Sequence, residues 1–416
     1  MLYERWRQIA SEHRNETALY DLGRGERWTF SQLAAAAESA DASEPIIFPQ
    51  GPQFIPALLG AWRCGKVVCP LEAEQAPPAI GKSPAGCVHL KTTSATTGAP
   101  RLIAFTAEQL AADAENIIAT MGLRADWPNL GVISLAHSYG FSNLILPMLL
   151  HGIPLILVSA PLPETVRKAA QAFDAVTLAA VPALWRTWHD ADAIPGNVRL
   201  AISAGAPLSV ALEQSVFETR GLKVHNFYGS SECGGIAYDG SSAPRTDASC
   251  VGEPLKNVQL SISADGCLQV HSRAVGQTYL PEPGVEVADG CFRTSDLAEI
   301  LDGKVHMRGR AGDQINVAGR KLSPESIERV LLSHPGVRDC LVFGAPSADA
   351  ERSETIVACI AASGPEDSES LKHFLLEKLP AWQLPREWIF VKTLEANQRG
   401  KFSRADWRKK YLQGRR

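Results

Sequence analysis

The sequence lacks paired cysteines and long apolar runs. Its nine cysteines are scattered without a Cys-x-x-Cys pair, which argues against a zinc site or a redox couple, and we expect mostly buried, reduced thiols. The most apolar stretch, residues 144–158, contains a histidine, a glycine and two prolines, and it falls short of the roughly 20 residues that cross a bilayer. Residues 1–7 lack the basic-then-apolar order of a secretory signal. We therefore expect a cytoplasmic protein with no membrane partner.

The sequence also has no large excess of either charge. Its 41 lysines and arginines face 45 aspartates and glutamates, giving a formal net charge of −4, which argues against a nucleic-acid binder. With 416 residues, 45% of them hydrophobic, the chain can form two or three hydrophobic cores. A disordered or fibrous protein is excluded by this composition. A multidomain enzyme is the default expectation.

The order of apolar runs predicts an α/β fold. From about residue 44 to 228, short buried strands alternate with helices, which is typical of a layered α/β sheet. Thr106 followed by Gln109 predicts a capped helix start, and Gly122 predicts the end of that helix. The strands are expected at residues 46–48, 67–69, 132–135, 155–158, 176–178, 200–202 and 224–227.

After residue 250 the pattern changes. Asp-Gly pairs at residues 265–266, 289–290 and 302–303 predict the tight turns of a small antiparallel β unit. Beyond Arg310, Ser323 followed by Pro324 predicts a helix start, and further strands and a helix follow at residues 340–343, 356–360 and 371–378. We predict a large layered N-terminal domain over residues 1–310 that includes the β unit. A small, mobile α+β C-terminal domain should occupy residues 311–416.

A loop rich in hydroxyl groups, called here the hydroxyl loop, occupies residues 92–101. It reads Thr-Thr-Ser-Ala-Thr-Thr-Gly-Ala-Pro-Arg and follows the apolar residues 87–90. Its hydroxyls, backbone amides and terminal guanidinium can surround a polyphosphate. It lacks the Gly-x-x-x-x-Gly-Lys-Ser/Thr pattern of a Walker loop. Taken alone, such a loop is as typical of an ordinary surface turn.

Five further motifs follow the hydroxyl loop in order. They are Ser-Ala-Gly-Ala-Pro-Leu at 203–208, Tyr-Gly-Ser-Ser-Glu at 228–232, Arg-Thr-Ser-Asp-Leu at 293–297, Gly-Arg-Ala-Gly-Asp at 309–313 and Arg-Gly-Lys-Phe at 399–402. From about residue 85 onward, the chain therefore resembles the adenylate-forming superfamily of acyl-CoA synthetases, peptide-synthetase adenylation domains and luciferases. Each motif is weak alone, whereas six in the same order are specific. The resemblance implies ATP-dependent activation of a small or aromatic carboxylic acid as acyl-AMP.

The resemblance also implies where the nucleotide binds. The hydroxyl loop should hold the β and γ phosphates of ATP, Tyr228 should offer its ring face to adenine, and Asp296 should bind the ribose. Out of this context, a core tyrosine and a hairpin Asp-Arg pair are ordinary structures. The implied nucleotide-binding residues are Thr93, Ser94, Thr96, Thr97, Gly98, Arg101, Ala204, Gly205, Ala206, Tyr228, Gly229, Ser231, Asp296 and Arg310.

Three residues should act directly in the chemistry that the resemblance implies. Glu232 should bind Mg²⁺, and Lys401 should draw the acyl carboxylate and the α-phosphate together in the transition state. His137 should gate the acyl pocket or contact the carboxylate, although a histidine at a strand end is equally often simply packed. Outside the family context, Glu232 and Lys401 are typical solvent-exposed side chains.

The second half-reaction needs a thiol acceptor, for which the resemblance favours CoA. The alternative is the phosphopantetheine arm of a separate acyl or aryl carrier protein acting in trans, and the basic residues 408–416 suit either one. In the family the C-terminal domain rotates between the two steps, about a hinge that falls here near Ala311 and Gly312.

Several positions depart from the family pattern. Ala95 and Ser295 stand where glycine is usual, Arg101 where lysine is usual, and Gly312 where aspartate or lysine is usual; the stretch ahead of the hydroxyl loop is also short. These departures keep open a catalytically impaired nucleotide-binding paralogue. A serine hydrolase is disfavoured, because Cys233 replaces the last glycine of a Gly-x-Ser-x-Gly elbow.

Overall fold

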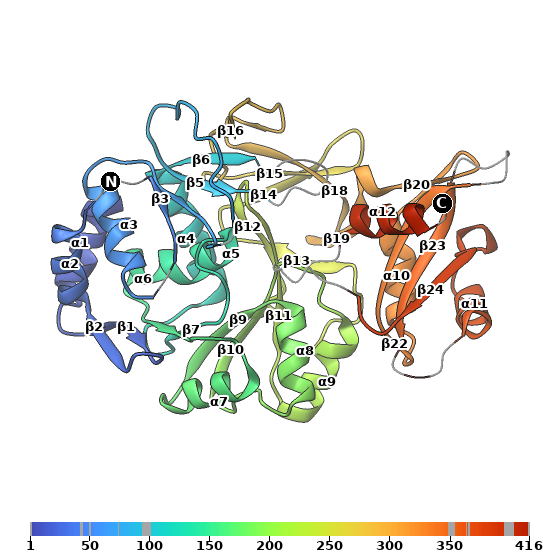
Figure 1. Cartoon of the computed structure of the whole chain (residues 1–416), viewed down its shortest axis with the longest axis horizontal. Coiled ribbons are helices and arrows are strands. Elements are labelled where there is room, and N and C mark those ends of the chain that lie inside the picture. Colours follow the sequence, from blue (N-terminus) through green and yellow to red (C-terminus); the bar gives the residue numbers. More distant parts are fainter. Residues whose placement is uncertain are drawn as a thin grey trace. The chain divides into compact units, whose positions relative to one another are not determined.

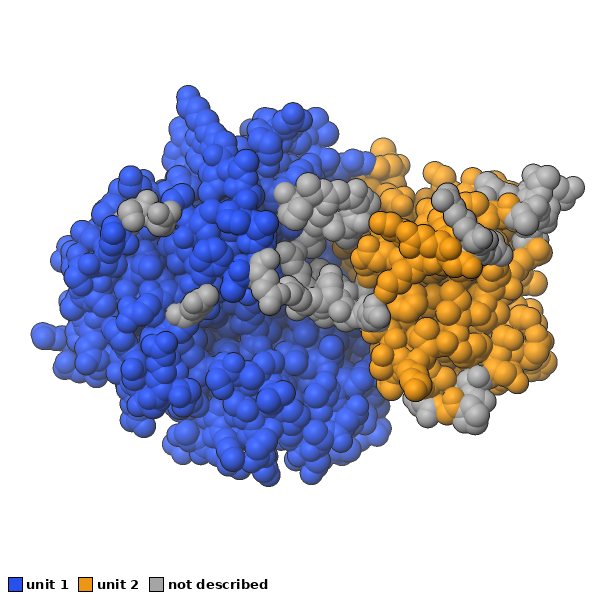
Figure 2. Space-filling model, viewed as in Figure 1, with its two compact units in different colours: residues 1–246, 251–261, 269–293 blue, residues 247–250, 262–268, 294–416 orange. Residues whose placement is uncertain are grey.

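Figure 1 shows the computed structural model of the chain. The structure describes residues 2–41, 45–49, 51–73, 75–93, 101–347, 354–362, 364, 367–394 and 403–414. The chain forms two compact units, coloured in Figure 2: unit 1 comprises residues 1–246, 251–261 and 269–293, and unit 2 comprises 247–250, 262–268 and 294–416. Helices and strands alternate through a large N-terminal sheet domain, and a smaller C-terminal part follows, which confirms the predicted fold class.

The core of unit 1 is a sheet with parallel central strands. In spatial order these are β8 (Leu155–Leu157), β7 (Asn129–Gly131), β9 (Val176–Ala180), β10 (Val198–Ser203) and β11 (Val224–Ser230). β8 also pairs in parallel with β1 (Thr17–Asp21), which pairs in antiparallel with β2 (Glu26–Thr29). All five residues of β9 are buried, as expected for a strand covered on both faces.

Three helices contribute to the core beside these strands (Figure 1). They are α7 (Pro163–Gln171), α8 (Pro182–Asp190) and α9 (Val210–Arg220). Val166 of α7, Trp185 of α8 and Val216 of α9 are fully buried in one cluster with residues of β7 to β11. Burying large apolar side chains of this kind contributes roughly 1.5–3 kcal/mol each, so this cluster fixes the sheet on which two of the motifs stand.

A second, smaller sheet of unit 1 holds the hydroxyl loop. It contains β5 (Cys87–Thr92), β6 (Leu102–Thr106) and β16 (Thr278–Leu280), all antiparallel. The loop connects β5 to β6, and Thr92 pairs with Leu102 at its base. β16 continues the register, because Leu280 pairs with Leu102 and Tyr279 with Ile103. A residue far along the chain therefore lies beside the base of the loop.

A two-stranded parallel pair is formed by β3 (Ile46–Ile47) and β4 (Cys69–Pro70).

The helix that follows the hydroxyl loop has the predicted caps. α4 runs over Ala107–Met121, Thr106 and Gln109 form a reciprocal capping box, and Gly122 ends the helix with φ of 70°. The other helices of unit 1 are α1 (Leu2–Glu12), α2 (Phe30–Ser39), α3 (Phe54–Arg63), α5 (Ser138–Gly140), the π-helix η1 (Phe141–Ile145) and α6 (Leu146–His151). Within the described ranges, no helix is long and apolar enough to span a membrane.

The strand predicted at residues 132–135 is wrong. The strand there, β7, ends at Gly131, and the chain then bends towards α5. Ser134 supports the bend, since its Oγ accepts a hydrogen bond from the amide of Ala136 at 3.2 Å. A Cβ atom at Gly140 would lie 2.0 Å from the carbonyl oxygen of Ser134, so only glycine permits this close approach. Local polar contacts thus override an apolar sequence run.

The region between residues 250 and 310 has the predicted antiparallel strands. β12 (Gly234–Tyr238) precedes it, and the region contains β13 (Cys250–Pro254), β14 (Gln259–Ile262), β15 (Cys267–His271), β17 (Val287–Ala288), β18 (Cys291–Leu301) and β19 (Lys304–Arg310). Asp302 and Gly303 turn β18 into β19 with φ of 49° and 77°. Asp289 and Gly290 do the same between β17 and β18, with φ of 49° and 74°. Both dipeptides therefore adopt the positive φ angles that tight hairpin turns need, as the sequence predicted.

The rest of unit 2 is a small α+β structure. Its strands are β20 (Ile315–Val317), β21 (Arg320–Leu322), β22 (Val337–Pro346), β23 (Glu354–Ala362) and β24 (Glu387–Val391). Its helices are η2 (Ala311–Asp313), α10 (Pro324–Leu332), α11 (Ser368–Leu376), η3 (Ala381–Gln383) and α12 (Arg404–Gly414). Ile327 of α10, Val342 of β22 and Leu371 of α11 are fully buried in one core cluster. The predicted helices and strands of this region are confirmed.

A partly buried ionic cluster ties α12 to two other parts of unit 2. The guanidinium of Arg404 lies 2.8 Å from carboxylate oxygens of Asp313 and Glu325 and 2.7 Å from Glu328. Burial raises the pKa of Glu328 to about 7, and the nearby Glu325 adds to the rise, while Arg404 opposes it. One guanidinium among three carboxylates leaves an excess of negative charge, so a proton on Glu328 near neutral pH is physically reasonable.

Glu328→Gln should remove part of the pH dependence of stability. Because the pKa of Glu328 is raised from 4.5 to about 7 on folding, the folded protein holds a proton that the unfolded chain releases. The corresponding stability is complete below about pH 4.5 and is lost as the pH rises through about 7. Across this window the wild-type protein should lose up to about 3 kcal/mol of unfolding free energy relative to the variant. Urea denaturation of both proteins near pH 5 and near pH 8 measures this loss of unfolding free energy. The same change with pH in the wild type and the variant would contradict the prediction.

Candidate active site

Two hydrogen bonds join the two ends of the hydroxyl loop at its base. The amide of Thr93 donates to the carbonyl of Arg101 at 2.9 Å, and the amide of Arg101 donates to Thr93 Oγ1 at 3.1 Å. Both predicted residues therefore lie at the base of the loop, one on each side. The predicted residues Ser94, Thr96, Thr97 and Gly98, together with Lys401, lie outside the described residues.

Tyr279 joins the end of the loop to the predicted metal ligand. The guanidinium of Arg101 lies 3.6 Å from the centre of the Tyr279 ring, and the Tyr279 hydroxyl donates to Glu232 Oε1 at 3.2 Å. Burial and the charge of Glu232 raise the pKa of Tyr279, so the hydroxyl keeps its proton and remains a donor. A cation and a carboxylate are thus held on one aromatic side chain. Sequence reasoning missed Tyr279, because only the register of β16 against β6 reveals its place.

The motif at 228–232 lies against the base of the hydroxyl loop. Ser231 Oγ donates to the carbonyl of Thr92 at 3.3 Å, and the amide of Glu232 donates to Ser230 Oγ at 3.2 Å. Packing requires glycine at position 229, because a Cβ atom there would lie 2.6 Å from the carbonyl oxygen of Gly234. The tight β11–β12 turn therefore brings Glu232 close to the loop.

The predicted adenine-binding residues lie at the carboxyl ends of adjacent parallel strands. Ala204 follows β10, is buried, and donates its amide to the carbonyl of Ala180 at 3.2 Å. Gly205 has φ of 87°, which favours glycine, and Ala206 follows it. Tyr228 lies half-buried in the neighbouring β11. Ligands of open α/β sheets bind at this edge, so the placement suits a nucleotide base.

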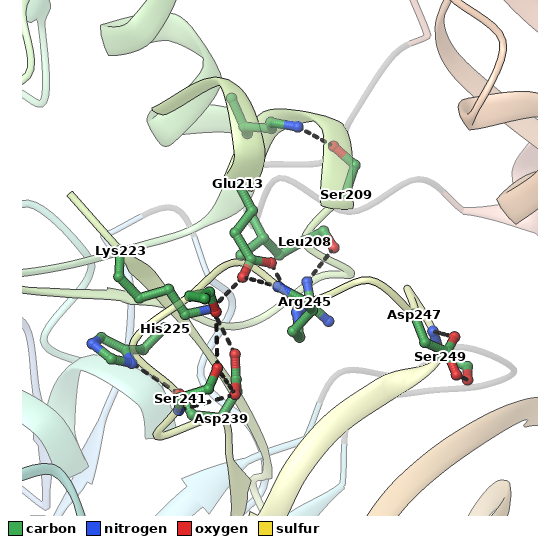
Figure 3. Close-up of polar contacts among 12 residues, drawn as sticks. Leu208, Ser209, Glu213, Lys223, His225, Asp239, Ser241, Arg245, Asp247 and Ser249 are labelled. Atoms are coloured by element: carbon green, nitrogen blue, oxygen red, sulfur yellow. Dashed lines mark hydrogen bonds and ion pairs between the residues drawn. The ribbon is translucent and has the colours of Figure 1, made fainter. Parts of the chain in front are cut away.

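A buried charge cluster supports the segment after Gly205 (Figure 3). Arg245 donates to the carbonyl of Leu208 at 2.8 Å and pairs with Glu213 of α9 at 2.8 Å. Lys223 pairs with Glu213 and, at 2.6 Å, with Asp239. Because breaking one partner of a buried ion pair typically costs about 3–5 kcal/mol, this cluster holds Leu208, α9 and β11 in fixed relation. Nothing local in the sequence predicted it.

His137 stands between the bend after β7 and α5. Its Nε2 lies 3.7 Å from Glu72 Oε1, and the hydroxyl of Ser134 donates to the same carboxylate. The side chain of His137 is 25% exposed, so it is neither fully packed nor freely solvated. Glu72, which sequence reasoning did not select, gives this imidazole a carboxylate neighbour.

The predicted ribose-binding pair lies in unit 2. Asp296 and Arg310 face each other across the β18–β19 register, and Arg310 Nε lies 2.8 Å from Asp296 Oδ1. The amide of Asp296 donates to Thr294 Oγ1 at 3.0 Å. The facing arginine therefore orients the carboxylate.

Family models match two parts of this chain. Residues 82–286 match the AMP-binding enzyme family, and residues 326–401 match the AMP-binding enzyme C-terminal domain. The 2-succinylbenzoate–CoA ligase of Bacillus cereus (strain Q1) is 27% identical over 334 residues, which cover 76% of this chain and 68% of that protein.

Solved structures of such proteins share the fold. ATP-bound MatB from Rhodopseudomonas palustris matches with a TM-score of 0.86 at 19% identity, over 99% of both chains. The o-succinylbenzoate CoA synthetase from Bacillus subtilis, in complex with the acyl-adenylate intermediate OSB-AMP, matches with a TM-score of 0.80 at 20% identity, over 97% of both chains. With its six motifs in order and both family domains matched, the chain belongs to the adenylate-forming superfamily and is an acid–thiol ligase of the AMP-forming acyl-CoA synthetase type.

Proposed function

We propose that this protein activates a small or aromatic carboxylic acid with ATP and transfers the acyl group to CoA. The contact of Tyr279 with both Arg101 and Glu232 carries the proposal, because it supports a cation and a metal-binding carboxylate at the end of the hydroxyl loop. The names of the relatives support the acid class, since 2-succinylbenzoate contains an aromatic ring with carboxylates.

The first half-reaction makes a mixed anhydride. A carboxylate oxygen attacks the α-phosphorus of ATP, the bond from that phosphorus to the bridging oxygen breaks, and pyrophosphate leaves. Arg101 neutralises phosphate charge, and Ser231, which would turn its hydroxyl away from the Thr92 carbonyl, is the donor that we assign to the α-phosphate. Tyr228 and residues 204–206 hold the adenine, Asp296 accepts hydrogen bonds from the ribose hydroxyls, and Arg310 orients that carboxylate.

The second half-reaction makes the thioester. The sulfur of the thiol attacks the acyl carbon, the carbon–oxygen bond to AMP breaks, and the thiol proton is released. We propose that the part of the chain beyond Arg310 rotates as a domain over residues 311–416, so that the surroundings of the acyl-adenylate differ between the two steps.

Glu232 fits a magnesium ion that is bound mainly through the nucleotide. Within the described ranges, no group of three His, Cys, Asp or Glu residues could hold a metal. Mg²⁺ commonly takes one or two carboxylates and completes its six oxygens with phosphates and waters. Glu232, oriented by the Tyr279 hydroxyl, would supply one such oxygen. When bound, the ion would neutralise charge on the phosphates.

Acid-dependent exchange of labelled pyrophosphate into ATP tests the first half-reaction. We expect exchange with Mg²⁺ and at least one member of a panel of aliphatic, aryl and amino acids, because only a reversible adenylation returns the label to ATP. Protein that binds ATP but shows no exchange across the panel would instead support the impaired nucleotide-binding paralogue.

The same preparation identifies the acceptor. With the active acid, acyl-CoA should accumulate from free CoA without a protein partner. If only a phosphopantetheinylated carrier protein is labelled, at a concentration matched to that of CoA, the protein loads a carrier instead.

Tyr279→Phe should weaken MgATP binding and leave the fold intact. The ring that stacks on Arg101 is kept, but Glu232 loses its hydroxyl donor. A hydrogen bond to a charged group contributes about 1.5–3 kcal/mol, so we expect roughly tenfold weaker binding by calorimetry. Tyr238→Phe, at another buried tyrosine of unit 1, is the matched control. Equal affinities for the two variants would refute the role given to Tyr279.

Lys401→Ala should impair adenylation far more than thioester formation from supplied acyl-AMP. The ammonium is needed while two anionic groups approach, and removing one preorganised charge contact typically slows a reaction on the order of 100-fold to 1,000-fold. Lys304→Ala, at an exposed lysine of β19 outside the six motifs and the basic tail, is the control and should change neither step. Equal losses in both half-reactions for Lys401→Ala would remove its step-specific role.

A further inference from the structure

A lysine is buried in the strand that leads into the hydroxyl loop. Lys91 of β5 is only 2% exposed. Its Nζ lies 3.1 Å from Ser142 Oγ, 3.3 Å from Ser138 Oγ and 3.5 Å from Asp113 Oδ2. None of the six motifs includes Lys91, and the reaction steps proposed above do not use it.

Packing alone does not explain this residue. Burial lowers the pKa of Lys91, and the charge of Asp113 opposes that effect, so the ammonium depends on its partner. A buried ion pair is often no more stable than a well-packed apolar pair of the same volume. β5 is otherwise largely buried, and an apolar side chain at position 91 would suit such a strand. We therefore looked for a role of the Lys91–Asp113 pair in positioning the elements around it.

Asp113 connects Lys91 to the turn that carries Glu232. Its Oδ1 accepts a hydrogen bond from the amide of Gly235 at 3.1 Å, and its Oδ2 accepts one from Ser142 at 2.5 Å. Gly234 has φ of 70°, and a Cβ atom there would lie 2.0 Å from Asp113 Oδ1. The β11–β12 turn is thus pressed against the carboxylate, and glycine at position 234 permits the contact.

The pair joins three elements of the candidate site. Lys91 directly precedes Thr92, which accepts a hydrogen bond from Ser231 at the base of the loop. Gly234 comes two residues after Glu232, and Ser138 directly follows His137. We propose that Lys91, paired with Asp113, is a positioning residue that fixes the base of the hydroxyl loop against the Glu232 turn for MgATP binding and adenylation. This role rests on the proposed function.

A double variant separates positioning from stability. Lys91→Met alone would leave the carboxylate of Asp113 buried without its cation and would destabilise the fold. Lys91→Met/Asp113→Asn removes both charges and keeps an oxygen that can accept from Gly235. We expect a melting temperature close to that of the wild type, MgATP affinity by calorimetry weaker by roughly tenfold, and pyrophosphate exchange slower by roughly 100-fold.

Leu33→Ala is the matched control for a loss of stability. Leu33 is fully buried in α2, so the variant should melt several degrees lower and still bind MgATP as the wild type does. Wild-type MgATP affinity in the double variant would overturn the positioning role. An equal loss of affinity in Leu33→Ala would overturn it too, because the effect would then follow stability.

Ser142→Ala is the second variant, in case the double variant does not fold. It removes the hydroxyl that contacts both Lys91 and Asp113 and leaves the charges paired. We expect MgATP affinity roughly fivefold weaker, since one hydrogen bond typically contributes about 1 kcal/mol. If the double variant does not fold, an unchanged MgATP affinity in Ser142→Ala would reject the proposal. If the wild type binds MgATP but exchanges no pyrophosphate, the proposed function fails, while the affinities still decide the role of Lys91.

Discussion

The contact of Tyr279 with Arg101 and Glu232 is the interaction on which the proposed nucleotide site of unit 1 depends. A phosphate site needs a cation and a metal-binding carboxylate close together, yet the two would otherwise neutralise each other in a direct ion pair. The guanidinium lies over the ring and the carboxylate accepts from the hydroxyl, so both charges have a partner on one buried side chain. With Tyr279 between them, both groups would be available to the proposed nucleotide and its counter-ion.

Buried charge pairs support both motif-bearing regions of unit 1. Lys91 and Asp113 connect the strand that leads into the hydroxyl loop with the Glu232 turn, whereas Lys223, Glu213 and Arg245 support Leu208 in the segment after Gly205 (Figure 3). Such groups contribute little net stability, because desolvation offsets their attraction. Their effect is geometric: a buried charge tolerates few positions of its partner, so the elements that carry the two charges keep a fixed register.

The sequence predicted the features that depend on neighbouring residues. The capping box of Thr106 and Gln109 and the Asp302-Gly303 turn need only a few adjacent side chains, and both are present. The strand expected at 132–135 failed, because the contacts of Ser134 and the close approach of Gly140 end β7 earlier. Tyr279 and Lys91 could not be found from sequence, since their roles arise from pairing with residues far away in the chain.

The Arg404 cluster limits where a domain rotation can occur. Arg404 follows Lys401 by three residues and is bonded to Asp313, so the chain after Lys401 and the segment after Gly312 move together. On the other side, Arg329 of α10 donates to the carbonyl of Met307 at 3.2 Å, and Gly309 of β19 packs closely on Ser323. A rotation at residues 311–312 would keep the first set of contacts and break the second. A hydrogen bond and a close glycine contact are weaker than a guanidinium shared by three carboxylates, so a rotation at residues 311–312 would break the weaker of these named contacts.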